Sequence, residues 1–509
     1  MNPETKYDQY RKKMARIADL DFANAVLGWD QQVYMPKNGA EGRGRQMATL
    51  STLSYELFTA PGFESLLEDL LQDLSRSDRS AESAEGGLSA VERFNVERTL
   101  RDVRRKKKYS ESFVEEMALT TSKAFGAWHE ARSKREFAIF EPLLTKIVDL
   151  KRQEAEFLGY EEHPYNALVE DYEPGLKVKK IDEVFEQVKR ELFPFTRDVA
   201  ARFKPDVSFL SKAYPKAKQW EFSKAIIEKM GYDFDSGRAD DAPHPFCTTF
   251  APGDVRITIR SAENEFNMML FAAIHEAGHA LYELGLPQQD QYGLPAGSAL
   301  SMAFHESQSR FWENNIGRSL PFWKGQYGAL QKLFPENLES VPLEAFYRGV
   351  NAVEPSFIRV EADELTYHAH IYIRYLIEKA LVAGELEVRD VPGFWNDRYE
   401  EYLGIRPAHD GEGCLQDVHW SYGSFGYFPT YSFGSFQAAQ LHAAMKREMP
   451  DFDAKIERGE FAPILKWLRE KVHVHGKRYS SDELLKQVTG EELKVSHFMN
   501  YVRGKYGAI

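Results

Sequence analysis

Apolar residues recur at three- and four-residue spacing along much of the chain, and this period constrains the fold more than any other feature. Residues 4 to 30, 90 to 135 and 136 to 160 show it among many lysines, glutamates and arginines. Such spacing gathers apolar side chains on one face of a helix, which then packs against a core. The sequence therefore predicts a mainly α-helical protein.

One short segment has a different period. In DVRITIR, residues 254 to 260, valine or isoleucine alternates with a polar residue, as in a half-buried strand. The preceding residues 240 to 253, rich in Asp, Pro and Thr, are predicted to form a loop, as is the polar stretch 75 to 87. We therefore expect a small sheet embedded in a helical fold. The sequence shows no internal repeat or low-complexity linker that would separate independent domains.

The net charge disfavours two classes of partner. A formal charge of −13 over 509 residues argues against general affinity for nucleic acid or anionic membranes, since phosphate binding needs concentrated Lys and Arg. One basic run, residues 104 to 108, is more typical of a solvated helix face than of a nucleic-acid site.

Cysteine content and the N-terminus indicate the compartment. Only Cys247 and Cys414 occur, which excludes a disulfide framework and a cysteine-rich zinc site and fits a reducing environment. The charged N-terminus lacks the apolar core of a signal peptide. No apolar run approaches the ~20 residues that span a bilayer. We therefore expect a cytoplasmic protein that does not bind membranes.

The stretch FAAIHEAGHALYELG, residues 271 to 285, carries the pattern HExxH. On a helix, His275 and His279 lie one turn apart on one face, so both imidazoles can reach one metal ion. Glu276 lies beside the first histidine, where a general base acting on metal-bound water is needed. Chance gives this pattern about once in 25 chains of such composition, so a helix with two surface histidines is the alternative.

A catalytic zinc site takes three protein ligands and keeps one position open for water. Residues 297 to 315 are predicted to form another helix, and Glu306 on it could complete a His2Glu set, as in thermolysin-type peptidases. Glu306 alone would be interpreted as a surface residue. Its polar neighbours in residues 305 to 310 instead suggest a hydrogen-bonded site.

A third predicted helix, residues 356 to 381, carries polar residues at near-helical spacing: Arg359, Asp363, Tyr367, His370 and Arg374. One interpretation is a solvated face with ion pairs. The other is the wall of a cleft, with an arginine that binds a substrate carboxylate.

Residues 413 to 435 are dense in glycine and aromatic residues and are predicted to form a structured loop. Tyr427 and Tyr431 follow His419 in this stretch. A tyrosine hydroxyl or imidazole N–H aimed at the metal would stabilise a tetrahedral oxyanion. Simple aromatic packing is the alternative.

Six motifs occur together in this order: HPF at 244 to 246, DxRxT at 254 to 258, HExxH at 275 to 279, HESQSR at 305 to 310, IRxxAD at 358 to 363 and GxxQDxHW at 413 to 420. Together they closely resemble the carboxypeptidase Taq family, the thermostable carboxypeptidase 1 group of metallocarboxypeptidases. The likeness extends to LGWDQQVYMP at 27 to 36 and ALVEDYEPG at 167 to 175, and so covers nearly the whole chain.

The resemblance implies a gluzincin-like helical fold with a deep active-site groove, usually a homodimer, that removes single residues from peptides with a free C-terminus. It implies one divalent metal ion per chain, zinc by default and cobalt as an alternative, bound by His275, His279 and Glu306. It implies Glu276 as the general base and suggests Arg359 for the terminal carboxylate, with His419 and Tyr431 near the oxyanion. The other expected substrate-binding residues are Asp254, Arg256, His244 and Tyr427.

We expect a single catalytic domain over residues 1 to 509. Within it, residues 1 to about 230 would form a wall of the groove, 231 to 435 the metal-binding core, and 436 to 509 the C-terminal helices. The strand at 254 to 260 could pair with the substrate backbone as an added strand, which would give broad specificity.

Two other functions are compatible with the sequence. A metal-dependent oligopeptidase would share the site and cut internal bonds. A non-catalytic helical scaffold, with the basic run at 104 to 108 as a docking patch, would need no metal.

Overall fold

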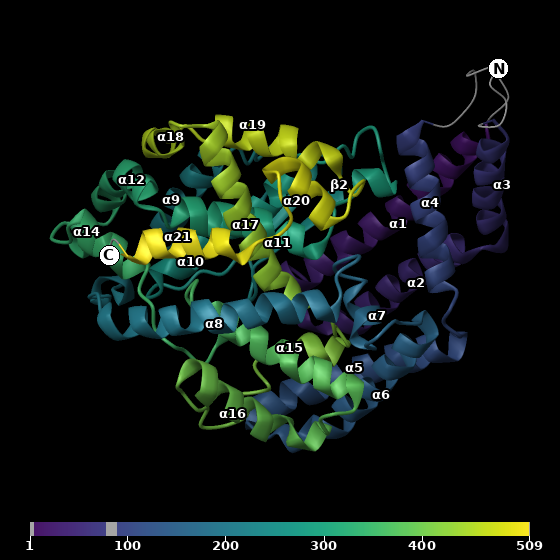
Figure 1. Ribbon diagram of the computed structural model, residues 1–509, viewed down its shortest axis with the longest axis horizontal. Coiled ribbons are helices and arrows are strands. Elements are labelled where there is room, and N and C mark those ends of the chain that lie inside the picture. Colours follow the sequence, from purple (N-terminus) through teal and green to yellow (C-terminus); the bar gives the residue numbers. More distant parts are fainter. Residues whose placement is uncertain (1–4, 78–88, 508–509) are drawn as a thin grey trace.

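The computed structural model describes residues 5–77 and 89–507, and its ribbon is mainly helical, as predicted (Figure 1). The helices of the N-terminal half are α1 (Lys6–Val33), α2 (Ala40–Thr59), α3 (Pro61–Ser77), α4 (Ala90–Lys106), α5 (Glu111–Lys134), α6 (Glu141–Leu158), α7 (Tyr165–Val169), α8 (Val178–Arg202) and α9 (Lys216–Met230). Those of the metal-motif region are α10 (Phe266–Glu283), α11 (Met302–Arg310), α12 (Leu320–Leu333), α13 (Pro335–Leu338), α14 (Leu343–Val350), α15 (Tyr367–Ala383) and α16 (Val391–Leu403). The last are α17 (Pro429–Glu448), α18 (Phe452–Arg458), α19 (Ala462–Lys471), α20 (Ser481–Thr489) and α21 (Val495–Gly507).

Each of the three periodic segments forms helices, with one break that the period did not reveal. Residues 90 to 135 form α4 and α5, which are separated by a short turn. Ser110 begins α5, because its hydroxyl oxygen accepts a hydrogen bond from the main-chain N–H of Phe113 at 3.2 Å. Of the predicted loop 75 to 87, residues 75 to 77 instead extend α3, and the remainder lies outside the described residues.

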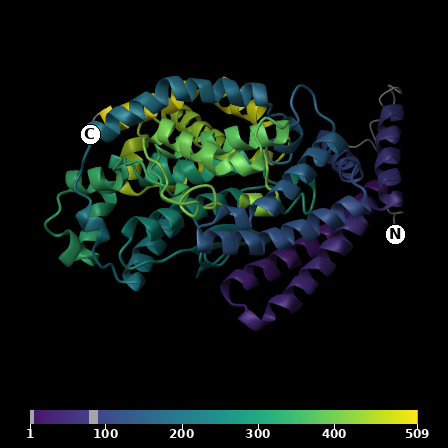
Figure 2. The same ribbon diagram turned by 90° about the horizontal axis from the view of Figure 1, so that it is seen from below.

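Two hydrophobic cores hold the helices together. The larger one contains the buried face of α10 and extends from Ala124 to Tyr506. A smaller one joins α1, α3 and α4, with Leu294 added from a distant loop. α1 and α2 pack as a hairpin at one edge of the molecule (Figure 2). The predicted divisions at residues 230 and 435 stay a prediction.

A three-stranded sheet confirms the predicted small β element. Its strands are β1 (Ala239–Asp241), β2 (Phe246–Ala251) and β3 (Asp254–Ile259), in the order β1-β3-β2. β1 is parallel and β2 antiparallel to β3. The alternating apolar residues of β3 are buried, and β3 packs against α10.

Two sequence predictions about this sheet are wrong. Residues 240 to 253 are not simply a loop, because β2 and part of β1 lie within them. The alternation of apolar and polar residues identified only β3, because one face of β3 is more buried than the other. Most β2 residues are half-buried on both faces, so β2 shows no such alternation. β3 is also the central strand, so both its edges are already paired and it cannot take a substrate as an added strand.

The basic run at 104 to 108 is not a free cationic patch. Arg104 and Lys107 bind Glu64, and Arg105 binds Asp171. Lys108 donates a hydrogen bond to the carbonyl oxygen of Leu158 at 2.6 Å. These partners largely neutralise the run, which removes the observation behind a docking scaffold. Within the described residues, no helix is both long enough and apolar enough to span a bilayer.

Candidate active site

α10 carries both histidines of HExxH and turns its apolar stripe into the larger core. That apolar stripe is fully buried: Phe266, Leu270, Ile274, Ala277 and Leu281. Glu263 and Glu265 precede the helix, and Glu265 is its N-cap. Gly278 lies where α10 crosses α11, and a Cβ there would stand 2.7 Å from the Cα of Ser309. Only glycine lets the two helices approach this closely.

α11 begins at Met302, later than the predicted start at 297, and its first N–H groups are capped by the adjacent Ser301 and by a distant segment. The hydroxyl of Ser301 accepts from the N–H of Phe304 at 3.1 Å. The N–H of Met302 donates to the carbonyl of Tyr172, and that of Ala303 to the carboxylate of Glu173 at 3.1 Å. α11 then continues as a π-helix, Phe311–Gly317.

The structure brings His275, His279 and Glu306 together. One carboxylate oxygen of Glu306 lies 3.5 Å from Nε2 of His275 and 3.4 Å from Nε2 of His279. Ligands bound to one zinc ion at about 2.0–2.1 Å in a tetrahedron stand about 3.3–3.4 Å apart. The donor set and its spacing therefore fit a zinc-type ion. In the described part of the chain, this is the one His/Cys/Asp/Glu group of at least three found with such spacing.

A charged network holds two of these residues in place. His275 Nδ1 lies 2.9 Å from the carboxylate of Glu313, which also accepts from Arg310 at 3.0 Å and Arg318 at 3.3 Å. Arg310 Nε donates to Glu306 at 2.7 Å, and the hydroxyl of Ser309 to its other oxygen at 2.9 Å. Burial alone would raise the pKa of Glu313, but Arg310 and its other partners lower it to about 2. Glu313 therefore stays ionised beside His275.

The other histidine has a different partner. His279 Nδ1 lies 2.6 Å from Nδ1 of His305, whose Nε2 lies 2.8 Å from the carboxylate of Glu283. Glu276 is buried beside these groups, with an exposed fraction of 6%. Burial raises its pKa to about 7, against the opposing charge of His275.

The predicted helix 356 to 381 begins eleven residues late, at Tyr367. Arg359 lies instead in a short 3-10 turn, Arg359–Glu361. The carboxylate of Asp363 accepts from the main-chain N–H groups of Leu365 and Thr366 at 2.9 and 3.0 Å, and this turn replaces the expected helix.

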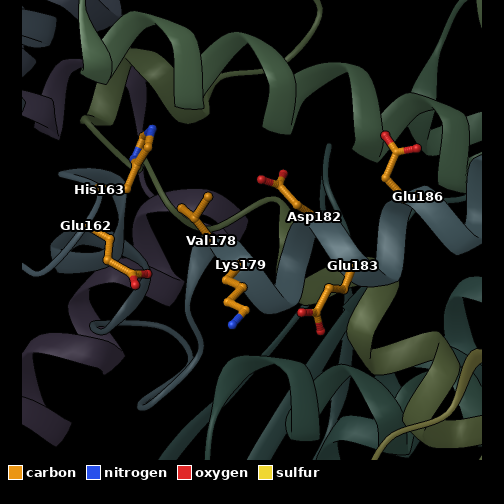
Figure 3. A pocket seen from close by; sticks show the side chains of 7 residues that line it. All are labelled: Glu162, His163, Val178, Lys179, Asp182, Glu183 and Glu186. Carbon is orange, nitrogen blue, oxygen red and sulfur yellow. The ribbon is translucent and has the colours of Figure 1, made fainter.

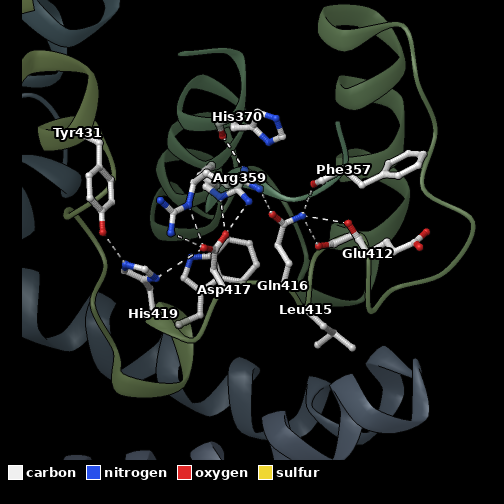
Figure 4. Close-up of polar contacts among 12 residues, drawn as sticks. Phe357, Arg359, His370, Glu412, Leu415, Gln416, Asp417, His419 and Tyr431 are labelled. Carbon is white, nitrogen blue, oxygen red and sulfur yellow. Dashed lines mark hydrogen bonds and ion pairs between the residues drawn. The ribbon is translucent and has the colours of Figure 1, made fainter. Parts of the chain in front are cut away.

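Arg359 and Arg374 converge on one carboxylate, that of Asp417. Figure 4 shows Arg359 beside this carboxylate. Arg359 donates to it through Nε at 2.9 Å and Nη2 at 2.8 Å, and donates to the hydroxyl of Tyr367 through Nη1 at 3.1 Å. The two arginines lower the pKa of Asp417 well below its usual range despite its burial. Arg359 is 6% exposed and Arg374 is fully buried, so the interpretation of a solvated face is wrong.

α17 begins within the predicted loop 413 to 435, so Tyr431 lies in a helix. Gly434 is inside this helix because a Cβ there would stand 2.7 Å from the side chain of Glu306, where α17 crosses α11. Nε2 of His419 lies 3.2 Å from the hydroxyl of Tyr431 (Figure 4). The ring of Tyr427 packs edge-on against that of Tyr431 at 5.1 Å.

The residues of HPF and DxRxT contact one another and α1. Arg256 donates to both oxygens of Asp254 at 2.8 Å, and its guanidinium lies over the rings of Trp29 and Phe250 at 4.8 and 4.7 Å. The hydroxyl of Thr258 donates to the carbonyl of His244 at 3.2 Å. The observed contacts of these residues therefore join the sheet to itself and to α1.

A surface hollow of about 590 Å³ lies elsewhere, along α8 (Figure 3). It is lined by Glu162, His163, Val178, Lys179, Asp182, Glu183 and Glu186. None of these is a predicted site residue. It is therefore not the predicted groove, which stays a prediction.

Sequence reasoning missed Glu283, Glu313 and Asp417, although two of them had a signal. Glu283 follows His279 by four residues and so extends the histidine face of α10 by one turn. Glu313 follows Glu306 by seven residues, which is two turns along the same predicted helix, residues 297 to 315. Asp417 lies within the motif GxxQDxHW, but nothing local indicated that it binds Arg359.

Comparison with known proteins agrees with this site. A family model described as Carboxypeptidase Taq (M32) metallopeptidase matches residues 9–506. Carboxypeptidase 1 of Bacillus subtilis (strain 168) is 42% identical over 99% of both chains, and thermostable carboxypeptidase 1 of Pyrococcus furiosus is 40% identical over 98% of both. The crystal structure of the M32 carboxypeptidase from Deinococcus radiodurans R1 matches with a TM-score of 0.93 at 36% identity, over 99% of each chain. The chain therefore belongs to the carboxypeptidase Taq family and is a metallocarboxypeptidase.

Proposed function

We propose that this enzyme removes single residues from peptides with a free C-terminus, with broad specificity, using zinc held by His275, His279 and Glu306. The observation that carries the proposal is the 3.4 and 3.5 Å separation of the Glu306 oxygen from the two imidazoles. A bound zinc ion would supply Lewis acidity and an activated water at neutral pH. Cobalt is the alternative ion.

Glu276 acts as the general base in this proposal. Its carboxylate accepts the proton from water as the water oxygen forms a bond to the last peptide carbonyl carbon. It then passes that proton to the amine nitrogen as the C–N bond breaks. Support comes from its position next to His275 and from its burial.

Tyr431 or His419 stabilises the negative charge that develops on the carbonyl oxygen. Their hydrogen bond at 3.2 Å fixes each group relative to the other. A well-placed donor at such a site contributes about 3–4 kcal/mol to transition-state stabilisation. Tyr427, in ring contact with Tyr431, would line the same side of the substrate.

Arg359 binds the free C-terminal carboxylate of the substrate in this proposal. Asp417 and Tyr367 accept three of the five N–H donors of its guanidinium, which leaves two for a substrate carboxylate. Asp417 also fixes the plane of the guanidinium, so a carboxylate would meet a preorganised partner. The roles in substrate binding predicted for His244, Asp254 and Arg256 rest on the resemblance alone.

The decisive experiment joins metal analysis to peptide digestion. Elemental analysis of the purified protein should give one zinc per chain. Mass spectrometry of a digested peptide should show a ladder that shortens from the C-terminus, and the same peptide with a C-terminal amide should be cut far more slowly. Internal cleavage of the amidated peptide would instead identify an oligopeptidase.

We further propose that the chain forms a homodimer in the cytoplasm. The resemblance supports the dimer, which sedimentation equilibrium would test. The two cysteines, Cys247 and Cys414, are unpaired, which fits a reducing compartment.

A further inference from the structure

His279 is the first member of a chain of three side chains that runs away from the proposed metal. Its Nδ1 lies 2.6 Å from Nδ1 of His305, and Nε2 of His305 lies 2.8 Å from Oε1 of Glu283. The first contact joins α10 to α11, and the second returns to the last residue of α10. The side chains of His305 and Glu283 are each about five-sixths buried, at 16% exposure.

Only one arrangement of protons along these three side chains allows a neutral His279 to coordinate the metal through Nε2. If Nε2 of His279 gives its lone pair to the ion, then Nδ1 of the neutral ring carries the proton. That N–H must donate to Nδ1 of His305, which is then the acceptor nitrogen. The proton of His305 therefore lies on Nε2, from which it donates to Glu283.

Glu283 is held as a carboxylate acceptor. Its other oxygen accepts from the hydroxyl of Thr249 at 3.1 Å and from the side-chain amide of Gln288 at 2.9 Å. Among the described residues, no lysine or arginine is recorded in an ion pair with Glu283, and its shortest polar contact is with Nε2 of His305 at 2.8 Å. Burial alone would raise the pKa of Glu283, but its hydrogen bonds, first that from His305, lower it.

The two proposed histidine ligands therefore have different support. His275 contacts the carboxylate of Glu313 directly, and Arg310 and Arg318 offset the charge of that carboxylate. His279 reaches a carboxylate only through a second imidazole. Groups that hydrogen-bond the outer nitrogen of a metal-ligating histidine fix its tautomer and raise its basicity, and their loss typically lowers metal affinity about 10- to 100-fold.

We propose that His305 and Glu283 are positioning residues that set the tautomer and orientation of His279 and so hold the zinc ion. Neither contacts substrate or the reacting atoms in this proposal. It rests on the proposed metal site and goes beyond it, because it assigns a role to the first residue of HESQSR and to the last residue of α10.

The test compares zinc dissociation constants, measured by chelator competition, for the wild-type protein and four variants. His305→Leu leaves Nδ1 of His279 without an acceptor and should weaken zinc binding about 10- to 100-fold. His305→Asn puts an amide oxygen near the position of the imidazole Nδ1 and should restore affinity to within about threefold of wild type. Glu283→Gln keeps an acceptor but removes the charge, and should weaken binding about tenfold.

Thr249→Val is the matched control. It removes a donor from the other oxygen of Glu283 and leaves both contacts of the chain in place, so the zinc dissociation constant should stay within twofold of wild type. A purely structural role for His305 would lower the unfolding temperature of the metal-free Leu and Asn variants and leave their zinc affinities equal. That result overturns the proposal.

Histidine tautomers give an independent measurement. Long-range proton–nitrogen correlation spectra of the zinc-loaded, 15N-histidine-labelled enzyme should show His305 protonated on Nε2. Protonation on Nδ1 would reverse the chain and refute the proposal. If the wild-type protein binds neither zinc nor cobalt, the proposed metal site fails instead, so the two failures are distinguishable.

Discussion

Gly278→Ala tests whether the close crossing of α10 and α11 builds the metal site. The added Cβ would stand 2.7 Å from the Cα of Ser309 and 2.9 Å from the carbonyl oxygen of Gln308, and both are backbone atoms of α11. Carbon atoms pack at about 3.5–4.0 Å, so the two helices must separate by about 0.8 Å or more. No side-chain rotation can relieve this contact.

The energetic cost has two parts of opposite sign. Overpacking of a tight contact destabilises a fold by about 1–3 kcal/mol. Alanine is favoured over glycine inside a helix by up to about 1 kcal/mol. The difference leaves a net loss of about 0–2 kcal/mol in the free energy of unfolding of the Gly278→Ala protein.

Metal affinity should fall as well. His275 and His279 lie on α10 and Glu306 on α11, so separation of the helices lengthens the 3.4 and 3.5 Å distances between the ligand atoms. A loss of about 1.4 kcal/mol in binding is a tenfold increase in the dissociation constant. We expect at least this increase for zinc, measured by competition with a chromogenic chelator.

Gly126→Ala is the control. Gly126 is also inside a helix, α5, and apart from the adjoining backbone of that helix no atom lies within 4 Å of the Cβ that alanine would add. This variant should be as stable as wild type or more stable by up to about 1 kcal/mol, with unchanged zinc affinity. If the Gly278→Ala protein matches it in both measurements, the helix crossing does not build the site.

Three further predictions concern the reaction and the pH dependence of stability. Glu276→Gln should keep its zinc, measured by elemental analysis, and lose about 10²- to 10⁴-fold in kcat; near-normal turnover would exclude the general-base role. Arg359→Ala should raise KM for free-ended peptides far more than for amidated ones, and an equal effect on both would remove Arg359 from carboxylate binding. Burial raises the pKa of Glu173 from 4.5 to about 7, so the folded state binds the carboxyl proton of Glu173 more tightly than the unfolded state does. The folded state therefore loses stability as pH rises from about 4.5 through 7. Glu173→Gln should match wild type near pH 4.5 and exceed its stability by about 3 kcal/mol at pH 8, and parallel pH profiles would contradict this.

Local sequence predicted the elements whose signal is short-range. The apolar period identified the segments of α1, α4, α5 and α6, and the two-residue alternation identified β3. The spacing of His275 and His279 placed both imidazoles on one face of α10. The same rule, applied one turn further, would have found Glu283.

Positions that depend on distant segments were predicted poorly. Arg359 was expected on a helix, but the side chain of Asp363 forms a turn, and Asp417, 58 residues away, fixes the guanidinium. Glycine content suggested a loop at 413 to 435, yet Gly434 is glycine because α17 presses against Glu306. β2 has no clear alternation, and its pairing with β3 defines it.

The sequence by itself therefore determined a helical protein with two histidines poised for one metal, because helix period and side-chain direction follow from backbone geometry over a few residues. Only the tertiary structure decided that the predicted ligand Glu306 lies within 3.5 Å of both imidazoles, and that Glu313, and His305 with Glu283, contact the two histidines. Those contacts depend on how closely α10, α11 and α17 cross. Gly278 and Gly434 set that closeness through the absence of a Cβ, which matters only once the neighbouring helix is in place.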